Sequence, residues 1–237
     1  MGKGVESNDL PAVSIIIPVY NEAERLPATL AALSHEKQVE ILVVDGGSTD
    51  DSPGIASKLG VTVLTSDRGR AAQLNKGAEA AKGEILLFLH GDTILPAGFF
   101  KPVLHVMQGH EFVAGAFQLR IDSLRRNIHW IARLANLRSR LLKLPYGDQG
   151  LFMRATTFHE LGGYADLPIM EDFSLVRRLR RKGKIVILAD AVITSGRRWE
   201  RLGILKTTLL NQIVIAGFLL GVSPVLLAKL YRGLQKR

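Results

Sequence analysis

The sequence predicts an α/β fold in which a mostly parallel sheet is covered by helices. Four short apolar runs alternate with segments of helical periodicity along the first 90 residues. This alternation is typical of parallel strands joined by helices that cover both faces of the sheet. Of the 237 residues, 47% are hydrophobic, which is enough for one sizeable core.

The first half of the chain supplies the expected strands and helices in order. The strands are expected at residues 13–18, 40–45, 61–66 and 84–90. The helices are expected at residues 22–34, 51–58 and 71–82. In the first helix, Leu26, Leu30 and Leu33 recur at helical spacing.

The second half is less regular and is expected to complete the same domain. Its elements are a strand with small residues, a basic Leu-rich helix, and a loop that enters a short strand, at residues 112–121, 124–144 and 146–154. Gly162 and Gly163 are expected to end one helix. Glu171 and Asp172 begin another, whose cationic end at residues 177–182 suits the helix dipole.

The C-terminal segment at residues 207–228 contains no charge over 22 positions and has basic residues on both sides. That length is sufficient for a bilayer span, but polar residues and Pro224 interrupt it. We expect a helix pair broken at 221–224, lying in a membrane interface or packed on a partner subunit. A full span and plain burial against the domain are the alternatives.

The net charge of +9 is unevenly distributed. Residues 1–119 hold 9 Lys and Arg against 14 Asp and Glu, a net −5, whereas residues 120–237 hold 22 against 8, a net +14. The basic half is expected to meet anionic lipid or phosphorylated substrates. Nucleic acid is disfavoured, because aromatic residues are only 6% and the basic clusters carry no stacking motif or zinc module.

Cysteine is absent, which excludes disulfides, thiolate zinc sites and cysteine nucleophiles and fits a reducing compartment. Residues 1–12 are polar and do not have the pattern of a signal peptide. The catalytic part is therefore expected in the cytoplasm, on the inner face of the membrane if the C-terminal segment contacts lipid.

Polar residues follow all four expected strands, and the carboxyl ends of parallel strands share one edge where ligands bind. The sets are Pro18, Tyr20, Asn21 and Glu22; Asp45, Gly46, Gly47 and Ser48; Ser66, Asp67, Arg68 and Arg70; His90 and Asp92. For Ser48 or Asp50, capping of the next helix and a role in the site are equally good explanations. Asp45 and Asp92 do not sit where a clean cap is needed. An ionised group beside an apolar strand is costly unless paired, so a ligand, a metal or a local turn must accommodate Asp92.

Two carboxylates, an arginine and glycine-rich turns at one edge suit a nucleotide-diphosphate site. One carboxylate would hold the base or ribose, and the other a divalent cation on the diphosphate. The chain lacks the GxxxxGK[ST] loop of P-loop proteins and the GxGxxG turn of dinucleotide-binding folds. The remaining way to bind the diphosphate is through a metal ion that bridges it to the protein.

Four segments resemble family 2 glycosyltransferases of the GT-A fold. They are SIIIPVYNEAERL, ILVVDGGSTDDS, GRAAQLNKGAEAAKGEILLFLHGDT and MEDFSLVRRLRRKG, in the family's order between about 13 and 200. The closest likeness is to the small bacterial branch often described as radical-SAM/selenodomain-associated. The resemblance implies a Rossmann-like central sheet in a domain at 1–203, with a donor half at 13–95 and an acceptor half at 96–203. Residues 204–237 would form a helical appendage.

The resemblance also implies a sugar-nucleotide donor, usually UDP-linked, and roles for particular residues. Pro18, Tyr20 and Glu22 match the donor-cradling turn, Asp45 the aspartate that recognises the base, and Arg70 an arginine that contacts base or phosphate. Asp92 matches the last residue of the Asp-x-Asp motif, which holds Mg²⁺ or Mn²⁺. His90 replaces the first aspartate, and a neutral imidazole there would bind the metal or only form a hydrogen bond.

On the acceptor side, Glu171 and Asp172 match the family's catalytic-base motif, with Asp172 as the base and Glu171 supporting it. Their alternative role is to cap the following helix. Asp148 and Gln149 match a loop that lines the acceptor side. GRRW at 196–199 resembles the Gln-x-x-Arg-Trp element of processive synthases without its glutamine, so polymerisation is doubtful. Arg197, Arg198 and Trp199 would cover the diphosphate or stack on a sugar, or be ordinary surface residues.

The expected function is a metal-dependent inverting transfer of one sugar from a nucleotide-diphosphate sugar. The apolar tail favours a lipid-linked acceptor, and the lack of a clear membrane span favours a small metabolite. A sugar-phosphate nucleotidyltransferase is the first rival, although its glycine-rich basic signature is absent after the first strand. The second is a nucleotide-sugar or lipid-binding module without catalysis. The tail is also a candidate for homo-oligomer contact.

Overall fold

The computed structural model describes residues 11–33, 36 and 38–235. The polar segment before residue 11 and the two basic residues at the C-terminus lie outside the described residues, as does residue 34 at the end of the first expected helix.

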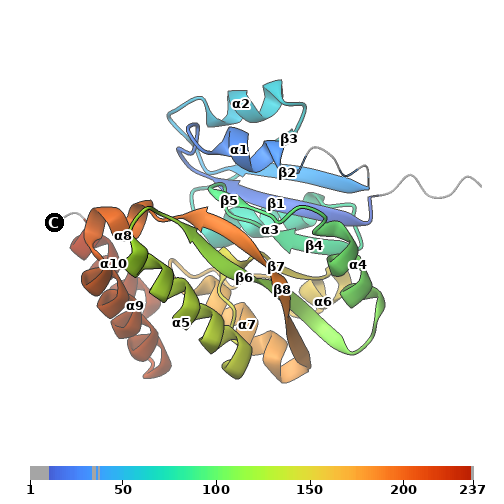
Figure 1. Cartoon of the computed structure of the whole chain (residues 1–237). Helices are drawn as coiled ribbons and strands as arrows, with labels where there is room; N and C mark the ends of the chain where they lie inside the picture. The colour runs from blue at the N-terminus through green and yellow to red at the C-terminus, as the bar shows by residue number, and fades with distance from the viewer. Residues whose placement is uncertain (1–10, 34–35, 37, 236–237) are drawn as a thin grey trace, which may run out of the picture.

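The centre of the fold is one eight-stranded sheet with the strand order β3-β2-β1-β4-β7-β6-β8-β5 (Figure 1). The strands are β1 (Val13–Val19), β2 (Val39–Asp45), β3 (Thr62–Thr65), β4 (Ile85–Phe88), β5 (Thr93–Ile94), β6 (Phe112–Asp122), β7 (Leu151–Arg154) and β8 (Lys184–Ser195). Strands β1 to β4 pair in parallel, as do β6 and β8, whereas β7 pairs antiparallel with β4 and β6, and β5 with β8. The α/β fold is confirmed, and its sheet is mixed.

Helices cover both faces of the sheet. They are α1 (Leu26–Ala31), α2 (Ser52–Lys58), α3 (Arg70–Ala80), α4 (Phe100–Gln108), α5 (Arg126–Leu142), α6 (Ala155–Glu160), α7 (Glu171–Lys182), α8 (Arg197–Leu202), α9 (Ile204–Leu219) and α10 (Pro224–Gln235), with a 3₁₀ turn η1 (Gly147–Gln149). Residues from α1, α4 and α5 share one core cluster, and residues from α3, α6 and α7 share the other. Because side chains alternate along a strand, Ile15 and Ile17 of β1 enter the first cluster and Ile16 the second.

Several boundaries differ from the sequence-based expectation. The first helix begins at Leu26 rather than residue 22; in the segment before it, the backbone N–H groups of Glu22 and Ala23 donate to Ser52 Oγ and Asp50 Oδ2 of the loop after β2. Strand β4 ends at Phe88, so His90 is not in the strand but starts a turn, in which its carbonyl accepts from the Thr93 N–H at 3.1 Å. Helices α4 and α8 and strands β5 and β8 are additional to the expected elements.

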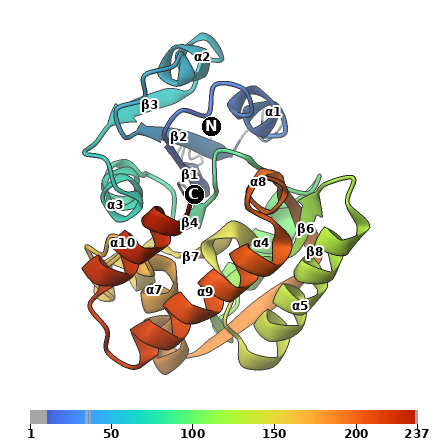
Figure 2. The ribbon, with the colours of Figure 1, turned by 90° about the vertical axis from the view of Figure 1, so that its left-hand side faces the viewer.

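The C-terminal segment forms the expected helix pair, α9 and α10 (Figure 2). The turn between them contains Gly221 with a φ of 83°, and Pro224 starts α10, where its missing N–H costs no helical hydrogen bond. One side of the pair is buried, because Leu210, Val214 and Leu227 pack against Ile169 and Met170. Every helix in the described part of the chain falls short of the length and apolarity that crossing a bilayer requires.

Candidate active site

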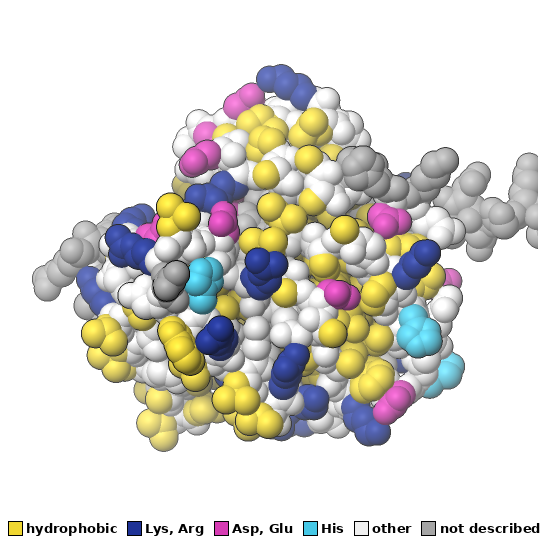
Figure 3. All heavy atoms as spheres, in the orientation of Figure 1, with side chains coloured by type: hydrophobic (Ala, Val, Ile, Leu, Met, Phe, Trp, Pro, Cys, Tyr) yellow, Lys and Arg dark blue, Asp and Glu magenta, His cyan; other side chains and the backbone are white. Residues whose placement is uncertain are grey.

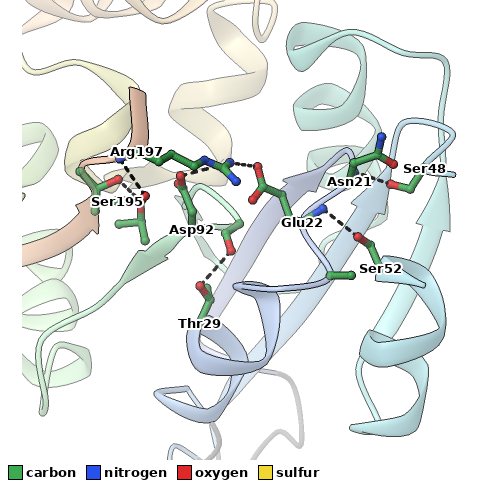
Figure 4. Close-up of polar contacts among 12 residues, drawn as sticks. Asn21, Glu22, Thr29, Ser48, Ser52, Asp92, Ser195 and Arg197 are labelled. Carbon is green, nitrogen blue, oxygen red and sulfur yellow. Dashed lines mark hydrogen bonds and ion pairs between the residues drawn. The ribbon is translucent and has the colours of Figure 1, made fainter. Parts of the chain in front are cut away.

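The carboxyl ends of β1 and β4 place two acidic side chains beside one arginine from the end of β8. Figure 4 shows Arg197 reaching toward the carboxylates of Glu22 and Asp92. The Arg197 guanidinium hydrogen-bonds Glu22 Oε1, and its Nη2 lies 3.4 Å from Asp92 Oδ2. The other Glu22 oxygen, Oε2, is buried without a hydrogen-bond partner. Burial raises the pKa of Glu22 above its ordinary value even though Arg197 lowers it.

The turn that carries Glu22 is fixed by the loop after β2. Asn21 has a φ of 55°, which is uncommon for a residue with a side chain. Its backbone N–H donates to Ser48 Oγ at 2.9 Å, and its side-chain oxygen accepts from the Thr49 N–H at 2.8 Å. The Glu22 N–H donates to Ser52 Oγ at 2.9 Å, as Figure 4 also shows. Residues that the sequence suggested as helix caps therefore tie two loops of the edge together.

Asp45 at the end of β2 is buried and faces its own turn. Its carboxylate accepts hydrogen bonds from the N–H groups of Gly47 and Ser48 at 3.0 and 3.1 Å. Gly46 is required by close packing, because a Cβ there would lie 2.9 Å from the Gln73 side chain. Local backbone donors thus supply hydrogen-bond partners for the buried Asp45 side chain.

Gln73 on α3 is a residue that holds this edge together and that the sequence did not predict to do so. Its amide nitrogen donates to the carbonyls of Val19 and Val44, each at 2.8 Å. These bonds hold the ends of β1 and β2 against α3. A glutamine among the apolar residues of an expected helix was the only sequence signal for it.

A second acidic group lies where α7 begins, beside α3. Arg70 at the start of α3 lies 3.5 Å from Glu171 Oε1 and 3.8 Å from Asp172 Oδ2. Burial, with the neighbouring Glu171 charge, raises the pKa of Asp172 to about 7, although Arg70 lowers it. The Asp172 side chain is 15% exposed. A carboxyl group that titrates near neutrality is suited to proton transfer.

The 3₁₀ turn η1 completes this acidic group. A Cβ at Gly147 would lie 2.1 Å from Asp172 Oδ2, so the close approach requires glycine. Burial raises the pKa of Asp148, whose Oδ1 is buried without a hydrogen-bond partner. Gln149 is fully buried and instead points into the fold, since its amide donates to the Phe117 carbonyl and to Ser139.

Aromatic and basic residues flank the two acidic groups. Arg68 stacks on Tyr20, with its guanidinium carbon 3.8 Å from the ring centroid. Arg198 lies over the Tyr231 ring of α10 at 4.5 Å, and its Nε and Nη2 are buried without a partner. Burial and the nearby Arg70 lower the pKa of Arg198 to about 10.

Trp199 packs against the core cluster of the α1 face, so its ring is only partly available. Pro18 lies within β1 and Asp92 within the turn after β4.

The described residues contain no group of three or more His, Asp or Glu side chains arranged to hold a metal. A divalent cation on a diphosphate takes most of its ligands from phosphate and water and needs only one or two from protein. Asp92 offers one carboxylate, although Arg197 contacts it. Burial, with the charge of Arg70, holds the pKa of His90 well below its usual range, so its imidazole is neutral as metal binding demands. The donor set fits a cation that arrives with the diphosphate.

Comparison with known proteins defines the class. A protein-family model described as Glycosyl transferase family 2 matches residues 14–163, more than half of the chain. The chain belongs to this family. The match begins in β1 and ends before α7.

Two curated relatives illustrate the range within the family. The undecaprenyl-phosphate 4-deoxy-4-formamido-L-arabinose transferase of Pseudomonas savastanoi pv. phaseolicola is 32% identical over 60% of this chain and 46% of its own length. Glycosyltransferase AglE of Haloferax volcanii is 39% identical over 36% of this chain and 32% of its own. The chain therefore spans less than half the length of either relative.

Solved structures share the fold at low sequence identity. The mannosyltransferase PcManGT from Pyrobaculum calidifontis, in complex with GDP-Man and Mn²⁺, has a TM-score of 0.66 at 20% identity, over 87% of this chain and 64% of that one. TarS from S. aureus, in complex with UDP-GlcNAc, has a TM-score of 0.63 at 20% identity, over 77% and 58%. Both support the GT-A architecture.

Proposed function

We propose that the protein is an inverting glycosyltransferase that moves a single sugar from a nucleotide-diphosphate sugar, most simply a UDP-sugar, to a lipid-linked or small-molecule acceptor. The observation that carries the proposal is Asp172, a largely buried carboxyl group with a pKa of about 7 beside Arg70. A family 2 fold with such a group on its acceptor side suits base catalysis.

In the proposed reaction, an acceptor oxygen attacks the anomeric carbon while the bond from that carbon to the diphosphate oxygen breaks. Asp172 takes the acceptor proton, and the bonding electron pair leaves with the nucleoside diphosphate. Glu171 Oε1 lies 3.5 Å from Arg70 Nη1 and holds this arginine beside the base, whose Oδ2 is 3.8 Å away. The cationic side chains of Arg70 and Arg198 neutralise charge on the leaving group.

On the donor side, Pro18, Tyr20 and Glu22 would line the nucleotide, with Asp45 toward the base. Asp92, together with His90 from the same turn, would hold Mn²⁺ or Mg²⁺. When bound, that cation supplies positive charge to the diphosphate. Asp148 and Trp199 would lie toward the acceptor, and the buried Gln149 would support that loop.

The remaining assignments are also proposals. They are the division into a domain at 1–203 and an appendage at 204–237, the likeness to the radical-SAM/selenodomain-associated branch, and a cytoplasmic location at the inner membrane face. The curated relative that acts on undecaprenyl phosphate favours the lipid-linked acceptor over a soluble metabolite.

Calorimetric titration with UDP and GDP, each with and without Mn²⁺, tests the donor site. We expect one nucleotide to bind only with the metal, and Asp92→Asn to abolish that binding. Asp190→Asn on β8 is the matched control, since Asp190 is exposed. The donor-site assignment fails if neither nucleotide binds under any metal condition, or if both variants behave alike.

A further inference from the structure

The outer side of α5 carries an apolar stripe that the fold does not bury. Trp130, Leu134, Leu137 and Leu141 recur every three or four residues, and their exposed fractions lie between 53% and 70%. The opposite side of the helix does the packing, because Ile128 and Ala132 are buried in the core. The stripe therefore contributes little to the stability of the isolated chain.

The C-terminal helices carry a second set of exposed apolar residues. Leu205 and Leu220 are 85% and 84% exposed, and Leu209, Val225 and Leu226 are also exposed. The inner side of the same helix pair is fixed by the packing of Leu210, Val214 and Leu227 described above. The pair thus docks on the protein through one side and leaves the other uncovered.

Both sets lie on one region of the molecule, which we call the docking face: the exposed residues of α5, α9 and α10. Helix α5 lies beside α9 in both ribbon views (Figures 1 and 2). The space-filling view shows apolar side chains interspersed with Lys and Arg over α5 and the adjoining C-terminal helices, at the lower left (Figure 3). An exposed apolar area of this kind marks an interaction surface.

The charges of the docking face indicate that its partner is anionic. Helices α5, α9 and α10 contain no aspartate or glutamate. Their basic residues include Arg133, which stacks on Trp130 at 4.8 Å, and Arg140, Lys206, Lys229 and Arg232. Two copies of this face would bring like charges together, whereas anionic lipid headgroups complement them. Apolar side chains bordered by Lys and Arg are typical of helices that lie in the membrane interface.

We propose that the docking face binds the surface of an anionic lipid bilayer, with α5, α9 and α10 lying in the interface and none of them crossing it. Trp130 and the leucines enter the headgroup region while Arg and Lys contact anionic headgroups. The contact of Arg198 with Tyr231 joins α10 to the candidate active site, so binding places that site next to the bilayer. The proposal deepens the lipid-linked alternative of the proposed function, but its test requires no donor and no activity.

The chain contains two tryptophans, Trp130 and Trp199, which provides a direct readout. In a Trp199→Phe background, Trp130 is the only tryptophan that reports on the face. We expect its emission to shift to shorter wavelength with phosphatidylglycerol-containing vesicles, and to be quenched by brominated acyl chains. Phosphatidylcholine vesicles should bind weakly, and added salt should weaken binding to the anionic vesicles.

The comparison of variants is by vesicle co-sedimentation. Leu134→Glu with Leu137→Glu should weaken binding by about tenfold or more. Leu59→Glu is the matched control and should bind like wild type, because Leu59 is 54% exposed and lies at the end of α2, away from the docking face (Figure 1). Circular dichroism checks that both variants fold. The proposal is overturned if the double variant binds as wild type, if binding ignores lipid charge, or if Trp130 is instead buried by concentration-dependent self-association without vesicles.

Discussion

Replacing Asp172 by asparagine should stabilise the protein at pH 8 while removing the proposed base. Burial and Glu171 raise the Asp172 pKa from 3.8 to about 7 in the folded protein. The folded state therefore binds a proton more tightly than the unfolded state, and wild-type stability falls as pH rises from about 4 to about 7. Asparagine does not ionise, so the variant escapes this loss.

The magnitude follows from the shift. About three pKa units at about 1.4 kcal/mol each give about 4 kcal/mol of extra unfolding free energy for the variant at pH 8, and about 2 kcal/mol at pH 5. Urea unfolding of both proteins at pH 5 and pH 8 measures the difference. A gain that does not change between the two pH values would refute the raised pKa, and the exposed Asp190→Asn should show no pH-dependent gain.

Three further predictions concern the same edge of the sheet. With substrates in hand, kcat/KM should rise with pH and level off above about 7 as Asp172 loses its proton; a rate that falls over pH 6 to 8 would contradict its role as base. Arg197→Gln should leave Glu22 and Asp92 without their counter-charge, which should lower the melting temperature slightly. The same change should strengthen Mn²⁺ binding, measured by electron paramagnetic resonance in the absence of nucleotide. Unchanged metal affinity would show that Arg197 does not compete for the carboxylates. Gln73→Leu should cost about 2 to 3 kcal/mol in urea unfolding, because two buried strand-end carbonyls lose their donor; a loss below about 0.5 kcal/mol would mean that water replaces the amide.

The first half of the fold was predictable because its signals are local. Strands β1, β2 and β4 are continuous apolar runs, and the polar residues after them meet at one edge. Asp172 was proposed as the base because Glu171 and Asp172 match the catalytic-base motif of the family that the sequence resembles. Strand β8 escaped prediction because Ala189 and Asp190, both exposed, interrupt its apolar pattern, and its pairing with β6 is not local.

The contacts of the site that the sequence did not predict are also between residues far apart in the chain. The ion pair of Arg197 with Glu22 joins residues 175 positions apart, and no spacing rule connects them. Likewise, the close fit of Gly147 against Asp172 depends on where η1 meets α7. Residue types could be proposed from the sequence, but their partners are set by tertiary packing.

The residue just before the acidic pair has a backbone conformation that only its surroundings can maintain. Met170 has a φ of 71°, which is costly for a residue with a long side chain, and its side chain packs against Leu210, Val214 and Leu227 of the C-terminal helices. A chain shortened at residue 203 would keep every strand of the sheet. Met170 would then relax to a commoner backbone geometry, and the first turn of α7 would rotate Asp172 away from Arg70. Trimming the apolar helices to improve solubility is thus expected to abolish the proposed activity while leaving the core of the fold intact.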